Sequence, residues 1–178
     1  DSKVVDENGK PLRVYHGTKQ FEGDAFRKDR IGSNFGYDKD GFFFTNEVGV
    51  YPGSANEYGE GGEILPVYLR LQNPYTLEDW AKDLNVSVRN LTHYGNDPQP
   101  PINLFDEDRR SIIEFAKKHG KDGVQFEYTA DGERLGLYVA FEPNQIKSAI
   151  GNNGNFDPAE DSILRSINAS VEGNAFYS

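Results

Sequence analysis

The stretch Val14-Tyr15-His16-Gly17-Thr18 decides how the rest of the chain is interpreted. Apolar and polar side chains alternate from position 12 up to His16, as is typical of a half-buried strand, and Gly17 and Thr18 end that strand. Upstream, the polar turn at residues 6–11 follows Val4-Val5, which predicts a short hairpin. A histidine at a strand end is by itself most often a hydrogen-bonded structural residue. Its meaning here therefore depends on the sequence that follows.

The downstream pattern predicts strands separated by inserted helices. Residues 22–41 are a long polar loop, and Gly41-Phe42-Phe43-Phe44-Thr45-Asn46 after it is a continuous aromatic strand. Thr45 or Asn46 is a candidate cap for a short helical stretch that ends near residue 59. Further strands are expected over the apolar runs at residues 64–71, 123–126 and 137–141, with one more edge strand at 145–150.

Two helices carry their own start and stop signals. Thr76 caps a helix over residues 77–84, and Asp79 completes a capping box. A second, amphipathic helix spans residues 106–119 and stops at Gly120. The polar segments 92–103 and 129–136 are expected to be a loop and a turn. Because strands dominate and helices do not alternate with them regularly, the sequence predicts an α+β fold.

Composition excludes several classes of function. The 178 residues suffice for one domain, and the net charge of -10 disfavours general nucleic-acid binding. The absence of cysteine excludes disulfides, thiol catalysis and zinc–thiolate sites, and His93 and His119 lack the spacing of a metal site. No apolar run approaches membrane-spanning length, and the N-terminus does not resemble a signal peptide. No metal and no membrane partner is expected.

The chain is expected to divide into a domain at residues 1–156 and a helical tail at 157–178. Asp157 is the candidate cap of the tail helix and Pro158 its first residue. The tail either docks on the domain or leads to a neighbour in a longer parent protein. The absence of methionine suggests a processed chain or an excised piece, so we expect a monomer or a part of a longer polypeptide.

Three segments, in this order, resemble the histidine-type ADP-ribosyltransferases, the branch that includes diphtheria-toxin-like enzymes and poly(ADP-ribose) polymerases. They are Val14-Tyr15-His16-Gly17-Thr18, then residues 41–46 with 54–58, and finally residues 137–148. More narrowly, residues 3–12, 143–149 and 151–158 resemble ADP-ribosyltransferase-like modules of phage and prophage polyvalent proteins. The resemblance implies a split β-sheet with inserted helices and an NAD cleft between the two halves of the sheet.

The resemblance also implies roles for individual residues. These enzymes use NAD as a substrate and break its nicotinamide–ribose bond through an oxocarbenium-like state, as in glycoside cleavage. His16 is expected to hold the adenosine ribose through a hydrogen bond, and Gly17 to offer backbone groups to the nicotinamide amide. Thr18 is expected to bind at the same end. Tyr58 either stacks on nicotinamide or is a buried aromatic residue.

Three further residues belong to the expected NAD pocket less directly. Phe43 or Phe44 occupies the other aromatic position of the family, so that one packs in the core and the other lines the pocket. Ser54 matches the small polar residue of the family motif with a longer spacing, and the alternative is a helix cap.

The catalytic acid is the point at which this sequence departs from the family. The glutamate at the head of the last strand is replaced by Leu137, which has no carboxylate to stabilise an oxocarbenium. One interpretation is that Glu133, upstream in the loop, supplies the acid; another is that Gln145 orients a substrate or is a hydrogen-bonded strand-end residue. A third is that the domain binds NAD without fast chemistry.

The leading interpretation is mono-ADP-ribosyl transfer from NAD to a macromolecule, foremost a protein, with NAD hydrolysis as a variant. Leu137 argues against polymer formation more strongly than against all activity. The alternative is a non-catalytic NAD- or partner-binding module of a phage or toxin-type protein. Action in the cytoplasm, also after delivery by a phage or a secretion system, is expected. Acceptor choice is expected to reside in the segments 92–103 and 129–136.

Overall fold

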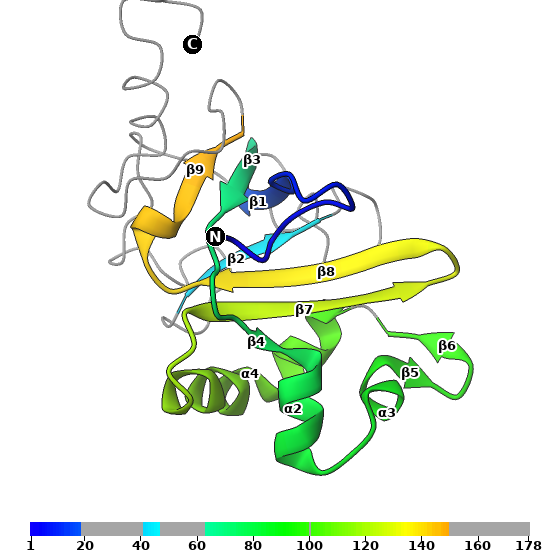
Figure 1. Cartoon of the computed structure of the whole chain (residues 1–178). Helices are drawn as coiled ribbons and strands as arrows, with labels where there is room; N and C mark the ends of the chain where they lie inside the picture. The colour runs from blue at the N-terminus through cyan, green and yellow to red at the C-terminus, as the bar shows by residue number, and fades with distance from the viewer. Residues whose placement is uncertain (19–40, 47–62, 100, 150–178) are drawn as a thin grey trace, which may run out of the picture.

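The computed structural model describes residues 1–18, 41–46, 63–99 and 101–149, and Figure 1 shows how they are arranged. The predictions for Ser54, for Tyr58, for the helical stretch before residue 59 and for the tail from residue 157 lie outside these residues. Within them, one large sheet is accompanied by few helices, which confirms the predicted α+β class. None of the described helices has the length and apolar character needed to cross a bilayer.

The sheet has seven strands in the order β4-β7-β8-β2-β1-β3-β9. Neighbouring strands are antiparallel except for β4 and β7, which are parallel. In chain order the strands are β1 (Val14–Thr18), β2 (Phe42–Thr45), β3 (Glu63–Leu69), β4 (Tyr75–Thr76), β7 (Gly123–Ala130), β8 (Glu133–Ala140) and β9 (Ile146–Ser148). The remaining elements are α2 (Leu77–Leu84), α3 (Val88–Thr92), β5 (His93–Tyr94), β6 (Asp97–Pro98), α4 (Pro101–Lys118) and the short 3-10 helix η2 (Pro143–Gln145).

The sheet is divided in the middle, between β1 and β2. Among the described residues, the ladder between these strands pairs only Tyr15 with Thr45. By contrast, β7 and β8 pair along their whole length, from Gly123 opposite Ala140 to Ala130 opposite Glu133. In Figure 1, β7 and β8 run across the view while β3 and β9 rise steeply above them. One half of the sheet is therefore β4-β7-β8-β2, and the other is β1-β3-β9.

Each face of the sheet carries its own core, because successive side chains of a strand point to opposite faces. On one face, strand residues such as Phe43 and Leu137 pack with Trp80 of α2 and Ile112 of α4. On the other face, the neighbouring strand residues Phe44 and Tyr138 join a cluster that is completed by β1, β3, β9 and the N-terminal segment. Figure 1 shows α2, α3 and α4 together below β7.

The local signals of α2 are confirmed in detail. The Thr76 side chain accepts from the Asp79 backbone, and the Asp79 side chain accepts from the Thr76 backbone, which together form the predicted capping box. The predicted start of the second helix, at residue 106, is wrong. α4 begins at Pro101, and it contains one residue with non-helical backbone angles, Asp108. The loop predicted at 92–103 is also wrong, since α3 ends within it and the hairpin of β5 and β6 follows.

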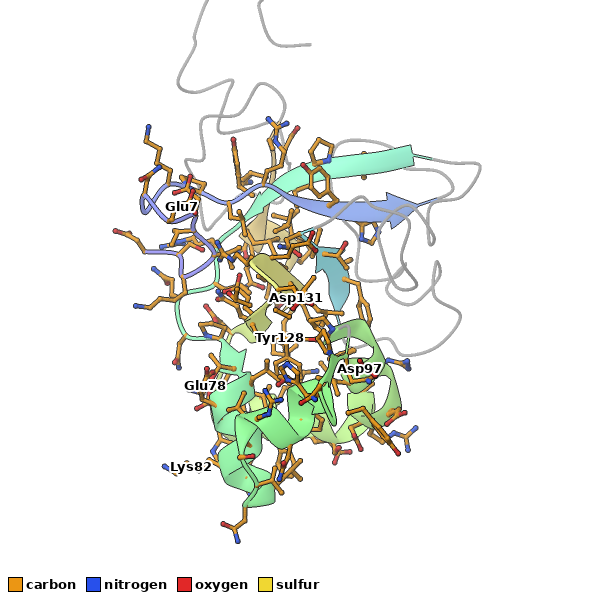
Figure 2. The ribbon with its side chains drawn as sticks, turned by 90° about the vertical axis from the view of Figure 1, so that its right-hand side faces the viewer. Glu7, Glu78, Lys82, Asp97, Tyr128 and Asp131 are labelled. Atoms are coloured by element: carbon orange, nitrogen blue, oxygen red, sulfur yellow. The ribbon has the colours of Figure 1, made fainter. Side chains whose placement is uncertain are left out.

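The turn predicted at residues 129–136 is far shorter in the structure. β7 continues to Ala130 and β8 begins at Glu133, so the connection is the dipeptide Asp131-Gly132, with φ of 53° and 79°. Positive φ at both central residues is the geometry of the tight hairpin turn that an Asp-Gly pair favours. Figure 2 looks toward this end of the hairpin and labels Tyr128 and Asp131 between Glu7 and Asp97.

The N-terminal hairpin is confirmed and is tied to the sheet. Val5 forms a bridge with Pro11, and the Asp6 carboxylate accepts from the backbone of Asn8 at 2.8 Å and of Lys10 at 3.0 Å. The Lys3 backbone N–H then donates to the Leu71 carbonyl at 2.6 Å. This segment therefore covers the face of the sheet that carries Phe44 and Tyr138, where Val4 is fully buried.

The tight turn leads to a first prediction. Gly132→Ala should lower the free energy of unfolding by about 1 kcal/mol, because a Cβ is disfavoured at a φ of 79°. Asp131→Asn is the matched control, since asparagine tolerates the left-handed region, and should change stability by less than about 0.5 kcal/mol. Urea unfolding of the three proteins measures both values. Equal effects of the two substitutions would contradict this description of the turn.

Candidate functional site

His16 lies where the two halves of the sheet meet. It belongs to β1, next to Tyr15, and only 5% of it is exposed. Its Nδ1 is 2.6 Å from the carbonyl oxygen of Phe43 in β2, and its ring lies 5.3 Å from the Phe44 ring, centroid to centroid. A side chain of one half-sheet is thus hydrogen-bonded to the backbone of the other.

Burial sets the protonation state of this histidine. Loss of hydration lowers the pKa of His16 from 6.5 to about 4, and the hydrogen bond to the Phe43 carbonyl opposes the shift only in part. The ring is therefore neutral at pH 7. Because a carbonyl can only accept, Nδ1 carries the proton and donates to Phe43, which makes Nε2 the acceptor of the ring.

The residues next to His16 pair with β3 through their backbone, whereas the aromatic residues of β2 pack their side chains into the two cores. Gly17 and Thr18 continue β1 and pair with Ile64 and Glu63 of β3. Phe43 points into the helical core, where its ring meets that of Phe105 edge-on at 4.9 Å. Phe44 points to the other face and supports the His16 ring. Of the two aromatic residues proposed for the pocket, the structure brings Phe44 to His16 as a ring contact and Phe43 as a backbone acceptor.

Leu137 lies in register, across β2, with Tyr15, the residue next to His16. It pairs with Thr45 of β2, which pairs with Tyr15 of β1. The side chain of Leu137 is fully buried and packs with Phe43 and Phe126 in the helical core. At this position the chain therefore has a core residue where the resemblance implies an acid.

Glu133 is not in a loop, contrary to the prediction. It is the first residue of β8, is exposed, and pairs with Ala130 beside the turn. Glu133 precedes Leu137 by four positions, which corresponds to about 13 Å along a strand. The ladder with β7 therefore places this carboxylate well away from the level of Tyr15 and Thr45.

Gln145 is held by the backbone around it. Its Oε1 accepts from the backbone N–H groups of Phe141 and Glu142 at 2.9 and 2.7 Å. Its Nε2 donates to the Asp122 carbonyl at 2.8 Å and points to the Arg70 carbonyl at 3.4 Å. The amide is fully engaged within the protein, and this arrangement favours the structural alternative for Gln145 over substrate binding.

Asn46 was proposed only as a helix cap, and the structure gives it a different partner. Its Nδ2 donates to the Arg134 carbonyl at 2.7 Å, and its Oδ1 accepts from the Gly136 backbone N–H at 2.9 Å. The side chain thus extends the pairing of β2 with β8 beyond the last strand residue, Thr45. The sequence shows an amide directly after an aromatic strand, but this pattern does not reveal the strand to which the amide is hydrogen-bonded.

A partly buried ionic network that the sequence did not reveal lies on β7 and β8. The Glu127 carboxylate accepts from the Arg134 guanidinium, from the Tyr138 hydroxyl and from Gln125. Burial and the Glu127 charge raise the pKa of Tyr138, which remains a neutral donor. Gly136 makes this possible, because a Cβ there would meet the Tyr138 hydroxyl at 2.3 Å. The hairpin that bears Glu133 is therefore clamped by side chains as well as by its ladder.

The other histidines have structural partners. His119 at the end of α4 lies 3.3 Å from the Asp83 carboxylate of α2, and its ring stacks on Tyr75. The ring Nδ1 of His93 lies 2.8 Å from the Thr92 hydroxyl. In the described ranges, no three His, Asp or Glu side chains converge as a metal site requires.

The buried neutral histidine gives a prediction about pH. Between pH 6.5 and 4 the unfolded chain binds a proton at His16 and the folded chain does not, so stability falls as the pH falls. The loss from this residue should reach about 3 kcal/mol. His16→Asn keeps a donor for the Phe43 carbonyl but does not titrate. Unfolding of both proteins across this range gives the difference, and equal pH slopes would contradict the prediction.

The buried Leu137 gives a second prediction for the site. Leu137→Glu restores the family's acid in sequence but buries a carboxylate in the helical core, so it should destabilise the fold by about 3 kcal/mol or more. Leu137→Met conserves volume and apolar character and should cost less than about 1.5 kcal/mol. Thermal unfolding distinguishes them. A stable, folded Leu137→Glu protein would contradict the description of this position as part of the helical core.

No curated protein and no solved structure matches the chain. The model of a family described as ADP-ribosyltransferase in polyvalent proteins matches residues 6–156. This match includes β1 with His16, β2, and the last long strand β8 with Leu137. It covers most of the chain, and the large sheet with few helices is consistent with an α+β fold of this kind. The chain therefore belongs to the family of ADP-ribosyltransferases found in polyvalent proteins.

Proposed function

We propose that the chain cleaves NAD at the nicotinamide–ribose bond and transfers a single ADP-ribose to a macromolecular acceptor, foremost a protein. The observation that carries the proposal is the state of His16. It is buried, neutral and fixed at the junction of the two half-sheets, directly before Gly17 and Thr18. A structural duty alone does not require a histidine and a glycine together at this point.

His16 is suited to hold a ribose. With Nδ1 donating to the Phe43 carbonyl, the acceptor Nε2 is oriented by the rest of the ring. Contact with Phe44 restricts the tilt of the ring further. A fixed acceptor binds a ribose hydroxyl with little loss of side-chain entropy on binding.

The nicotinamide end of the site is assigned to residues that follow His16. The backbone of Gly17 binds the nicotinamide amide, where a side chain would obstruct close approach, and Thr18 binds beside it. Tyr58 stacks on the nicotinamide ring, and Ser54 contributes a small polar group. These assignments rest on the family membership of the chain and on the order of the residues along it.

The chemistry requires no cofactor beyond the substrate. The bond from the ribose carbon to the nicotinamide nitrogen breaks, and nicotinamide leaves with the electron pair. The ribose carbon, which is oxocarbenium-like, then bonds to a nucleophile of the acceptor, and the acceptor loses a proton to solvent. Water as the acceptor gives NAD hydrolysis. Leu137 offers no charge to the oxocarbenium, which predicts slow transfer of one unit rather than polymer synthesis.

Glu133 remains the candidate acid nearest in sequence, but the structure argues against it as it stands. Its position beside the turn keeps it about 13 Å along the strand from Leu137. The clamp of Glu127 on Arg134 and Tyr138 restrains the hairpin close to it. Catalysis by Glu133 would require the hairpin end to fold over the cleft.

A second candidate function is a module that binds NAD or a partner without turnover. The observation that favours it is the burial of Leu137 in the apolar core at the level of Thr45 and Tyr15. In this case the residues around His16 would still bind NAD, but the carboxylate needed for cleavage would be missing. Binding without nicotinamide release, with and without protein acceptors, distinguishes this function from the first.

The leading proposal predicts the behaviour of two variants. His16→Asn should lower nicotinamide release from NAD at least about tenfold, because it deletes the Nε2 acceptor and keeps the donor for Phe43, and tenfold corresponds to about 1.4 kcal/mol in the barrier. Glu133→Gln should retain release within about twofold, since one exposed carboxylate distant from the cleft contributes little. Release is followed in the presence of protein acceptors, with unfolding curves as the control for folding.

Either of two results would overturn parts of the proposal. Unchanged release by a folded His16→Asn protein would remove His16 from the site. Loss of release in Glu133→Gln would identify Glu133 as the acid and show that the hairpin closes over the cleft. NAD labelled on its ADP-ribose part distinguishes the two activities. A transferase attaches the label to protein, whereas a hydrolase leaves it on ADP-ribose free in solution.

A further inference from the structure

The Asn46 side chain takes over the pairing with β8 where the backbone of β2 stops. The Asn46 backbone N–H lies 3.4 Å from the Gly136 carbonyl oxygen, which is long for a ladder hydrogen bond. The carboxamide continues the pairing instead, because its Oδ1 accepts from the Gly136 backbone N–H at 2.9 Å and its Nδ2 donates to the Arg134 carbonyl at 2.7 Å. Both ends of one side chain are thus bonded to the same strand.

The part of β8 that Asn46 binds is held firmly from its other side. Arg134 and Gly136 belong to the long ladder with β7. The Arg134 guanidinium also donates to the Glu127 carboxylate, which accepts from the Tyr138 hydroxyl as well. β2, by contrast, has only four residues. Of the two strands that Asn46 joins, β8 is therefore the support and β2 is the strand that is positioned.

β2 carries the groups that meet His16 and its neighbour. Thr45, next to Asn46, forms with Tyr15 the one ladder pair between the half-sheets in the described part of the chain. Two residues earlier, Phe43 offers the carbonyl oxygen to which His16 donates. The end of a short strand frays when its last hydrogen bonds are lost. Loss of the Asn46 amide would therefore loosen the backbone on which the orientation of His16 depends.

We propose that Asn46 is a positioning residue of the NAD site, which acts on the His16 ring through the Phe43 carbonyl. This inference rests on the proposed function, in which His16 Nε2 binds the adenosine ribose. Both ends of the Asn46 carboxamide are bonded to β8, so Asn46 acts without touching NAD. The adenosine ribose lies away from the bond that breaks. Weaker orientation of His16 should therefore weaken NAD binding more than it slows cleavage.

The first test observes the His16 ring directly and needs no NAD. NMR of the ring nitrogens, in the full chain isotope-labelled at its three histidines, reports the tautomer of each ring. The His16 signals are assigned by their loss in His16→Asn. The unmodified chain should show one tautomer, with the proton on Nδ1, and Asn46→Ala should show exchange between both tautomers. An unchanged His16 tautomer in Asn46→Ala would overturn the proposal.

A graded variant keeps this test decisive if Asn46→Ala does not fold. Asn46→Asp retains the acceptor for the Gly136 N–H but loses the donor for the Arg134 carbonyl. Its effect on the His16 signals should have the same direction and a smaller size. A folded Asn46→Asp protein with the His16 signals of the unmodified chain would argue against positioning by this amide.

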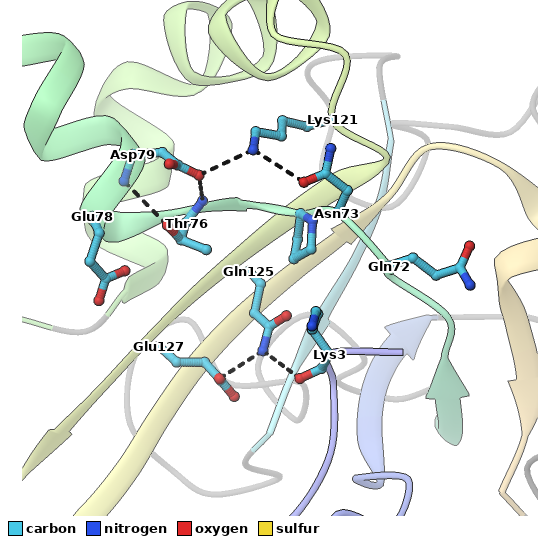
Figure 3. Close-up of a pocket in the computed structure, with 10 residues that line it drawn as sticks. Lys3, Gln72, Asn73, Thr76, Glu78, Asp79, Lys121, Gln125 and Glu127 are labelled. Carbon is cyan, nitrogen blue, oxygen red and sulfur yellow. Dashed lines mark hydrogen bonds and ion pairs between the residues drawn. The ribbon is translucent and has the colours of Figure 1, made fainter. Parts of the chain in front are cut away.

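Thr76→Ala is the control for general loss of stability. The Thr76 hydroxyl caps α2 by accepting from the Asp79 backbone N–H at 3.2 Å (Figure 3). Its removal lowers stability, but β7 and β8 lie between β4, to which Thr76 belongs, and β2. The His16 tautomer should therefore stay unchanged in Thr76→Ala. Equal changes in Thr76→Ala and Asn46→Ala would reduce Asn46 to a residue that only stabilises the fold.

The second test measures NAD cleavage. Asn46→Ala should raise the KM for NAD at least about threefold and keep kcat within about twofold, whereas Thr76→Ala should change neither. In the His16→Asn background, Asn46→Ala should not raise KM further, because its effect passes through His16. Additive effects of the two substitutions would overturn the proposal. A chain that neither binds nor cleaves NAD would overturn the proposed function, and the His16 tautomer would still decide whether Asn46 positions that ring.

Discussion

The hydrogen bond from His16 to the Phe43 carbonyl is the constraint on which the central part of the structure depends. The two half-sheets share one ladder pair, Tyr15 with Thr45, in the described part of the chain. A buried side chain therefore supplements a junction that the backbone alone holds weakly. The same bond fixes the tautomer of His16 and makes Nε2 an acceptor. The structural role of this imidazole and the ribose-binding role that we propose for it thus fall on one side chain, and burial keeps the ring neutral at pH 7.

Apolar packing organises the part of the sheet around Leu137. Leu137 lies in register with Thr45, but its side chain contributes to the core beneath α2 and α4. The polar groups of this hairpin are on the other face, where Glu127 binds Arg134 and Tyr138. The Glu127 carboxylate therefore lies close to Leu137 along the hairpin, but its hydrogen bonds are made to Arg134 and Tyr138 within the protein. This arrangement is compatible with slow chemistry, or with binding that has lost its chemistry.

Local signals in the sequence predicted most of the elements. Thr76 and Asp79 define the start of α2 because both partners of a capping box lie within one turn. Gly120 ends α4 with a φ of 68°, as expected for a residue with no Cβ. The turn at Asp131-Gly132 was placed too broadly, because the polar residues beside it suggested a loop although they belong to β7 and β8. Polarity alone does not distinguish an exposed strand from a turn.

The sequence by itself determined the α+β class, the capped helix and the order of motifs around His16, because these depend on periodicity and on residues close together in the chain. Only the tertiary structure decided the partners of Glu127, the hydrogen bonds of Gln145 and the place of Glu133 beside the hairpin turn. Each of these depends on which strands lie side by side and on the register between them. A shift of one residue would turn every such side chain to the opposite face, and no local pattern fixes that choice.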